Sequence, residues 1–339
     1  MRLSDFDYHL PKERIAQRPL KERDRSKLMK LDRQTGQVSR HRFFELPNLL
    51  DPNSVLVFNE SRVIPARLLF KGGNGKAEIL LIKPVPRKPN TWECMVRPGG
   101  KFPVSFTHQV DPELSFHVKK ITPEGLRVIQ FGCEDFNQYL KSHGHTPTPP
   151  YIKKEVSDPE QYQTIYAKTE GSVAAPTAGF HFTQKVFDDL KAKGIQTEFV
   201  TLHVGMGTFA PVKTEDITAH KLHSEWFSLS PPVAERLNKA KAKGKKIVAV
   251  GTTSVRVLES CTDNSGHLVS RSGETDIFIY PGYRWKFVDQ LITNFHVPKS
   301  SLLMLVSAFA GRDNILNAYE IAQKEQYRFF SFGDAMFIL

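Results

Sequence analysis

Residues 183–204, TQKVFDDLKAKGIQTEFVTLHV, have the pattern of a helix followed by a strand. Thr183 is a favourable N-cap, and the apolar residues that follow recur at three- and four-residue intervals, which places them on one helical face. Gly194 is the residue type that most often ends a helix, and the run 195–204 is rich in residues typical of a strand. The stretch predicts a helix packed against a sheet.

The same alternation extends over most of the chain. The predicted helices are 231–243, 255–261, 302–310 and 315–324, and the predicted strands are 28–31, 38–43, 54–58, 247–250, 275–279 and 327–332. Alternating helices and strands are typical of the α/β class. We therefore predict a discontinuous, barrel-like α/β main domain made of residues 1–66 and 151–339.

The segment 67–150 has a different pattern. Short β-like runs separated by Gly- and Pro-rich turns occur at 77–82, 91–96, 104–107, 114–118 and 126–131, with a short helix predicted at 135–142. The Pro-rich run 146–150 resembles a domain boundary. We predict a small all-β, barrel-like domain inserted into the main domain.

The composition favours a folded protein with a polyanionic partner. Hydrophobic residues make up 40% of the chain, and 47 Lys and Arg against 36 Asp and Glu give a net charge of +11. The run 236–246 (RLNKAKAKGKK) contains basic residues and no acid. A solvated helix face is the simpler interpretation of that run, and contact with an RNA backbone is the alternative.

Cysteine usage and hydropathy indicate a cytoplasmic protein. Cys94, Cys133 and Cys261 are too few and too widely spaced for a disulfide framework or a CxxC motif. The first residues lack the apolar segment of a secretory signal, and the apolar run 302–310 is about half the length that a membrane span requires. We expect a soluble monomer that makes no membrane contact.

Five loops have the composition of a ligand site. The stretch 166–183 (YAKTEGSVAAPTAGFHFT) combines small residues, hydroxyls and His181, and small residues let a ligand approach the backbone. The stretches 201–212, 220–226, 250–259 and 291–304 each join an apolar run to a polar turn that carries a His, an Arg or a carboxylate. Sites in α/β proteins are built from such loops at strand ends.

Two familiar motifs are matched only weakly. Residues 205–210 (GMGTFA) fit the dinucleotide-binding pattern, but Pro211 follows at once, where that motif requires a helix. Ligands for a metal are available in His203, His220, His223 and Glu225, although their spacing matches no established metal motif. We expect no metal.

Residues 251–256 (GTTSVR) lie between a predicted strand and a predicted helix. The amides of Thr252 and Thr253 would then lie at a helix N-terminus, which favours anionic groups, and Arg256 offers a forked contact to a carboxylate or phosphate. A simple N-cap would account for one hydroxyl only. We interpret this segment as a ligand contact.

Taken in order, several short motifs point to one family. They are IAQ (15–17), RD (23–24), VFN (57–59), RVIPAR (62–67), GSVAAPTAG (171–179), HVGMGTF (203–209), YRFFS (327–331) and GDAM (333–336). With these motifs the chain resembles, essentially from end to end, the S-adenosylmethionine:tRNA ribosyltransferase-isomerases of queuosine biosynthesis. The sequence departs from the family pattern in three places: Glu60-Ser61 stands for Asp-Thr, Ala210 for Arg and Leu222 for Met.

The resemblance implies an activity. The family transfers the ribosyl part of S-adenosylmethionine to 7-aminomethyl-7-deazaguanine at the wobble position of a tRNA and rearranges it to epoxyqueuosine, releasing adenine and methionine. S-adenosylmethionine is thus a consumed substrate, and no cofactor is expected. Because the sulfonium acidifies the 5′ carbon of the ribose, the site needs a base and must exclude water.

The resemblance and the residue chemistry together imply site residues. The candidate acid–base residues are His181, His203, Glu225 and Asp334, and the sequence leaves open which of them is the base. Thr252, Thr253 and Arg256 are candidates to hold the methionine carboxylate or a tRNA phosphate. The other candidate substrate contacts are Gly171, Ser172, Thr177, Gly205, Gly207, Thr208, Asn294 and His296.

Two other functions compete with this one. A conventional S-adenosylmethionine-dependent RNA methyltransferase normally has a Gly-rich loop after an early strand, and the N-terminal third lacks one. An RNA-binding module without catalysis would fit the basic charge. It would leave the His-, Thr- and Gly-rich loops after residue 166 without a purpose.

Overall fold

The computed structural model describes residues 1–71, 75–149, 151–153, 158–205, 212 and 214–339, which fall into two compact units. The first unit comprises Met1–Arg62, Pro150–Thr169 and Ala175–Leu339. The second comprises Val63–Pro149 and Glu170–Ala174. Each is organised around a sheet of its own.

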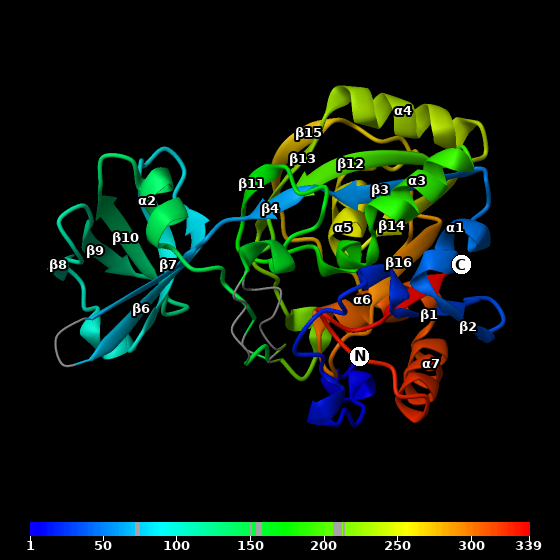
Figure 1. The fold of residues 1–339 in the computed structure, drawn as a ribbon, viewed down its shortest axis with the longest axis horizontal. Coiled ribbons are helices and arrows are strands. Elements are labelled where there is room, and N and C mark those ends of the chain that lie inside the picture. The colour runs from blue at the N-terminus through cyan, green and yellow to red at the C-terminus, as the bar shows by residue number, and fades with distance from the viewer. Residues whose placement is uncertain (72–74, 150, 154–157, 206–211, 213) are drawn as a thin grey trace. The chain divides into compact units, whose positions relative to one another are not determined.

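A nine-stranded sheet organises the first unit, in the order β15-β13-β12-β3-β14-β16-β17-β1-β2 (Figure 1). The neighbours β12, β3, β14 and β16 run parallel, whereas β17 is antiparallel to β16 and parallel to β1. The strands are β1 (Lys27–Leu31), β2 (Val38–Arg42), β3 (Ser54–Asn59), β12 (Gln196–Leu202), β13 (Glu225–Leu229), β14 (Lys246–Val250), β15 (Arg271–Thr275), β16 (Gln290–Asn294) and β17 (Ala335–Ile338). The α/β class is confirmed. In the described residues the strand order has two ends, so the sheet is open rather than a closed barrel.

Helices form at each of the predicted places in the first unit. The helices are α1 (Leu46–Leu49), α3 (Gln184–Ala192), α4 (Pro231–Ala242), α5 (Thr252–Cys261), α6 (Ser301–Ala310) and α7 (Arg312–Lys324). Helices α5 and α7 begin three residues earlier than predicted, and α1 was not predicted. Thr183 caps α3 by accepting a hydrogen bond from the Val186 amide at 3.4 Å, which confirms the predicted start. Val186 and Leu190 of α3 are buried in one apolar cluster with Phe58 of β3 and Phe182. That cluster fixes the segment just before α3.

Close packing explains one glycine of the 166–183 stretch. A Cβ atom on Gly179 would lie 1.9 Å from the Tyr166 hydroxyl, so a larger residue could not occupy the position without moving the ring. Residues 177–181 form a 3-10 turn whose far end carries the buried His181. The small residues here are therefore required for tight packing, in addition to any part that they have in binding a ligand.

Two predicted strands are wrong. β15 ends at Thr275, so the predicted strand 275–279 does not form, and the segment 327–332 turns instead of extending. Phe330 has a φ of 71°, outside the strand region, and a Cβ on Gly333 would lie 2.6 Å from the Arg328 carbonyl oxygen. The apolar residues of 327–332 are buried as predicted, but by a folded-back loop. The strand forms later, at β17.

A six-stranded antiparallel sheet organises the second unit, in the order β5-β6-β7-β10-β9-β8. Its elements are β5 (Arg67–Lys71), β6 (Lys76–Pro84), β7 (Thr91–Arg97), β8 (Thr107–Gln109), β9 (Ser115–Ile121), β10 (Arg127–Gly132) and α2 (Phe136–His143). Asp135 caps α2, and Phe136 stacks on Phe131 of β10 with ring centroids 4.4 Å apart. The strand predicted at 104–107 is displaced, because β8 begins at Thr107. The short strands β4 (Ser61–Val63) and β11 (Thr169–Ser172) pair with each other.

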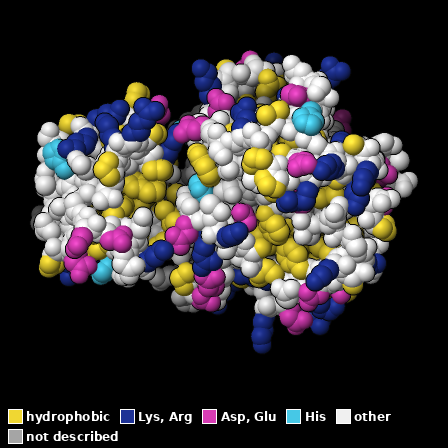
Figure 2. Space-filling view, turned by 90° about the horizontal axis from the view of Figure 1, so that it is seen from above, with side chains coloured by type: hydrophobic (Ala, Val, Ile, Leu, Met, Phe, Trp, Pro, Cys, Tyr) yellow, Lys and Arg dark blue, Asp and Glu magenta, His cyan; other side chains and the backbone are white. Residues whose placement is uncertain are grey.

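The basic run 236–246 lies on α4, the turn that follows it and the first residue of β14. Arg236 pairs with Glu198 at 2.6 Å, and Lys241 pairs with Asp289 at 2.7 Å. Figure 2 looks onto the face with α4 and shows Lys and Arg side chains interspersed with Asp and Glu. This pairing is typical of a solvated helix face. Among the described helices none is both long and apolar enough to span a bilayer.

Candidate active site

Two pockets of the first unit adjoin at helix α5. One, which we call the neutral pocket, has a volume of about 480 Å³ and is lined by Ala175, Pro176, Thr177, Ala178, Val204, Gly251, Thr252, Thr253, Thr293, Asn294, His296, Leu302, Phe330 and Ser331. The other, the ion-pair pocket, has a volume of about 380 Å³ and is lined by Leu222, His223, Glu225, Arg256, Ile277, Phe278, Ile279, Ser301, Leu302 and Leu305. They lie next to each other, because Leu302 lines both.

The junction of β14 and α5 forms one wall of the neutral pocket. Gly251 has a φ of 85°, a conformation that glycine adopts without strain, and it lets α5 begin directly after the strand. The first amide groups of α5 have no acceptor within the helix. Thr253 is 8% exposed, and its Oγ1 has no hydrogen-bond partner among the described residues. A buried hydroxyl left in this way is costly unless a ligand or water completes it.

An ion pair forms the polar wall of the second pocket. Arg256 of α5 donates through Nη1 to Glu225 Oε2, and both side chains are almost completely buried. Glu225 Oε1 accepts from the Gly205 amide at 2.8 Å, and Arg256 Nη2 donates to the Thr275 carbonyl at 3.3 Å. The Nε of Arg256 is buried without a partner among the residues described. The Nε–H of this guanidinium is therefore available to a ligand or a water molecule.

His181 does not line the neutral pocket itself but contacts Asn294, which does. Its Nε2 accepts from the Asn294 amide at 3.1 Å, and its Nδ1 contacts the Ser26 hydroxyl at 2.8 Å. Burial, aided by the charges of Arg328 and Arg23, lowers the pKa of His181 to about 3, so the ring is neutral. Asn294 Oδ1 in turn accepts from Thr177 Oγ1 at 3.2 Å. The imidazole thus orients two side chains that line the pocket.

His203 and His296 are held in similar ways. His203 stacks on Trp226 with ring centroids 4.9 Å apart and contacts the Ser61 hydroxyl at 2.8 Å, and burial lowers its pKa to about 4. His296 lines the neutral pocket, contacts Thr293 Oγ1 at 3.2 Å, and has a pKa lowered by burial to about 3. Both rings are unprotonated at neutral pH and are able to accept a proton.

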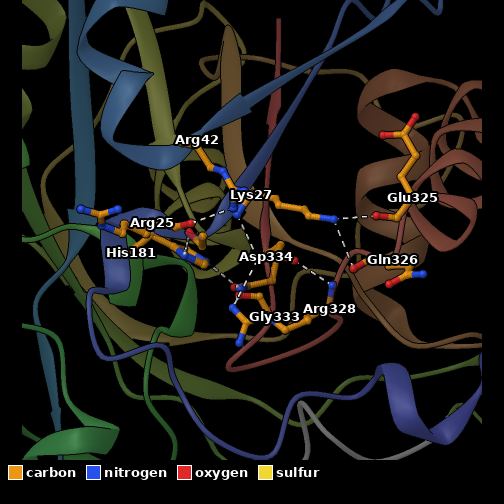
Figure 3. Close-up of polar contacts among 11 residues, drawn as sticks. Arg25, Lys27, Arg42, His181, Glu325, Gln326, Arg328, Gly333 and Asp334 are labelled. Atoms are coloured by element: carbon orange, nitrogen blue, oxygen red, sulfur yellow. Dashed lines mark hydrogen bonds and ion pairs between the residues drawn. The ribbon is translucent and has the colours of Figure 1, made fainter.

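Asp334 directly precedes β17, and its carboxylate accepts from two backbone amides and pairs with the Arg328 guanidinium at 3.3 Å (Figure 3). Its Oδ1 accepts from the Lys27 amide at 3.0 Å, and its Oδ2 accepts from the Arg328 amide at 2.8 Å. The carboxylate is 2% exposed and is absent from the lining of either pocket. This geometry ties β17 to the start of β1, and the role of Asp334 as a base stays a prediction.

We expect Asp334→Asn to lower the free energy of unfolding by about 1.5–3 kcal/mol. An amide at this position can accept one of the two backbone hydrogen bonds but must turn its own NH₂ group toward the other donor. Urea denaturation measures the loss. Asp313→Asn is the matched control, because the side chain of Asp313 is 85% exposed. Equal midpoints for the two variants would contradict a structural role for Asp334.

The remaining predicted residues are divided between several places. Thr177, Thr252, Thr253, Asn294 and His296 line the neutral pocket together. Gly171 and Ser172 belong to the second unit, where Ser172 Oγ donates to the Ala174 carbonyl at 2.6 Å. Gly207 and Thr208 lie outside the described residues, as do most of the dinucleotide-type motif and the departure at Ala210. In the described part of the chain, no three His, Cys, Asp or Glu side chains gather as a metal site would require.

Sequence reasoning missed several residues that line the pockets. The sequence predicts Ile277 and Ser331 to lie in strands, whereas both lie in non-strand segments and line a pocket. Thr293 lies in the 291–304 stretch, and its link to His296 was not foreseen. The pairing of Glu225 with Arg256, which are 31 residues apart, has no periodic signal that could have revealed it.

Comparison with known proteins agrees with this architecture. A family described as "Queuosine biosynthesis protein" matches residues 3–338. Proteins of Moorella thermoacetica and Clostridium kluyveri, both named S-adenosylmethionine:tRNA ribosyltransferase-isomerase, are 49% identical to the chain, with 100% of both chains covered in each case. The crystal structure of an S-adenosylmethionine tRNA ribosyltransferase from Thermotoga maritima is 37% identical, covers 99% of this chain and 100% of its own, and has a TM-score of 0.57. The chain therefore belongs to the queuosine biosynthesis protein family.

Proposed function

We propose that this chain transfers the ribosyl moiety of S-adenosylmethionine to 7-aminomethyl-7-deazaguanine at the tRNA wobble position and isomerises it to epoxyqueuosine, with release of adenine and methionine. The observation that carries this proposal is the 49% identity, over the whole chain, to proteins named for this transferase and isomerase activity. Two adjoining pockets at α5 offer polar groups of two kinds, uncharged in the neutral pocket and charged in the ion-pair pocket.

The described residues suit the demands of this chemistry. His296 lines the neutral pocket, and the rings of His296 and His203 are neutral, with lowered pKa values that make both weak bases. His181 and Asp334, buried behind their neighbours, act by holding other groups in place. Glu225 remains a candidate to orient or protonate a substrate group in the ion-pair pocket. No resident cofactor takes part in this proposal.

The proposal also extends to the organisation of the protein. We propose that residues 67–150 form an inserted β domain. The antiparallel sheet of the second unit supports this proposal. The enzyme would act as a cytoplasmic monomer, with the modified tRNA as its macromolecular partner. Gel filtration of the purified protein, with and without that tRNA, measures its apparent mass and so tests whether it is a monomer.

The test of function is a product analysis. Purified protein is incubated with S-adenosylmethionine and a tRNA that carries the aminomethyl-deazaguanine, and adenine, methionine and S-adenosylhomocysteine are quantified. We expect adenine and methionine in equal amounts, together with a mass increase of the wobble nucleoside. A tRNA with unmodified guanine is the control and should give neither. Formation of S-adenosylhomocysteine would mean methyl transfer, and tRNA binding without any product would favour the RNA-binding module.

A further inference from the structure

The two pockets lie side by side along helix α5. They share Leu302 at the beginning of α6, and each takes part of its wall from the same face of α5. Thr253 and Arg256 are three residues apart on that helix, so their side chains are neighbours on its surface. A ligand that extends along the first turns of α5 would contact both pockets.

The neutral pocket is built for an uncharged polar group. Its described lining contains no Lys, Arg, Asp or Glu, and its polar side chains are hydroxyls, the Asn294 amide and the neutral His296 imidazole. Because Thr177 gives its hydrogen to Asn294 Oδ1, its own oxygen can only accept a hydrogen bond from a ligand. The unpartnered Oγ1 of Thr253 adds another group, nine-tenths buried, at the N-terminus of α5. A nucleoside has the donors and acceptors that such a wall requires.

The ion-pair pocket is built for a zwitterion. Arg256 and Glu225 place a positive and a negative charge side by side, so a single phosphate would be attracted by one and repelled by the other. An amino acid carries both charges and can align with both. Leu222, Ile277 and Leu305 surround the pair with apolar surface, which suits the methylene groups and sulfur of a methionine side chain.

We propose that S-adenosylmethionine binds along α5, with its adenosine in the neutral pocket at Thr253 and its amino-acid end in the ion-pair pocket against Arg256 and Glu225. This orientation rests on the proposed function. It places the sulfonium at the boundary of the pockets, beside Leu302. It also assigns different ends of one substrate to Thr253 and Arg256, which the sequence had grouped as contacts to a single anion.

The test measures the Kd of two variants for each of two ligands. S-adenosylhomocysteine has both ends of the substrate, whereas 5′-methylthioadenosine lacks the amino-acid end. We expect Thr253→Val to raise the Kd of both ligands by about 5- to 10-fold, the effect of one hydrogen bond. Arg256→Lys keeps the charge beside Glu225 but loses the forked geometry, and should raise the Kd of S-adenosylhomocysteine by about 10-fold while leaving that of methylthioadenosine unchanged. Isothermal titration calorimetry measures all four values.

Folding and binding can be separated in this experiment. Thr253→Val removes a hydroxyl without a partner, so its melting temperature should not fall below that of the wild type. Ser307→Ala is the matched control, because Ser307 Oγ in α6 is also buried without a described partner but lines neither pocket, and both Kd values should stay unchanged.

Three results would overturn the proposed orientation. They are an Arg256→Lys variant that weakens both ligands equally, a Thr253→Val variant that weakens neither, and a wild type that binds neither ligand. Competition of inorganic phosphate with methylthioadenosine would indicate a phosphate site instead. The expected pattern of Kd values without release of adenine and methionine from the modified tRNA would keep the orientation and reject the proposed function.

Discussion

Replacement of Arg256 by methionine is expected to lower the free energy of unfolding by about 3–5 kcal/mol. The guanidinium and the Glu225 carboxylate are 7% and 4% exposed, so neither is well solvated. Methionine fills much of the same space but leaves Glu225 buried without its cation. The Gly205 amide, which donates at 2.8 Å, compensates only part of that charge. Urea denaturation followed by circular dichroism measures the loss.

The expected effect has an internal and an external control. Adding Glu225→Gln to Arg256→Met removes the uncompensated charge and should recover most of the lost stability. Lys239→Met breaks an exposed pair with Glu235, whose side chains are 69% and 65% exposed, and should cost less than about 1 kcal/mol. If Arg256→Met costs no more than Lys239→Met, the buried pair does not stabilise the fold.

Local sequence patterns were sufficient to predict those parts of the site that are formed by a single continuous segment of the chain. Strand β14, Gly251 and helix α5 follow one another in the chain, so the sequence predicted their order and placed Thr252 and Thr253 at a helix N-terminus. The cap at Thr183 was predicted for the same reason. In each case, backbone propensity and side-chain chemistry act within a few residues.

Contacts between distant segments could not be predicted in this way. Periodicity does not show which of several carboxylates meets Arg256, because that depends on the order of β12, β13 and β15 in the sheet. It identified 327–332 as buried but could not show that Phe330 takes a positive φ. Gly171 looked like part of the same loop as Thr177, yet the chain passes from the second unit to the first between them.

The histidines also show how environment overrides residue type. Residue type alone predicts His181 and His203 as acid–base groups, because free imidazoles titrate near neutral pH. In the structure, burial lowers the pKa of His181 to about 3 and that of His203 to about 4. Asn294 and Ser26 occupy the two nitrogens of His181, which makes it a positioning group. A buried histidine with a lowered pKa therefore makes the stability of the fold depend on pH, and this dependence can be measured.

The protein is expected to lose stability steeply as the pH falls from about 6.5 toward 4, the range over which unfolded histidines gain protons. His181 and His296 have pKa values lowered to about 3 when folded, from 6.5 when free. Within this window the unfolded state binds the protons and the folded state does not, so acid favours unfolding. Each histidine contributes a slope of about 1.4 kcal/mol per pH unit where its unfolded form is fully protonated. The stabilisation is fully present above pH 6.5 and diminishes below it.

Carboxylates add a slope of the same sign below about pH 5, so the decisive measurement is a comparison between variants. His181→Gln cannot titrate but can still accept from Asn294, and between pH 6 and 5 its stability should fall less steeply than that of the wild type by about one proton's slope. His9→Gln is the control, because the side chain of His9 is exposed, and it should follow the wild type. Parallel curves for all three proteins would mean that His181 is protonated in the folded state. Its hydrogen bond from Asn294, and with it the orientation of Thr177 in the neutral pocket, would then have to be reversed.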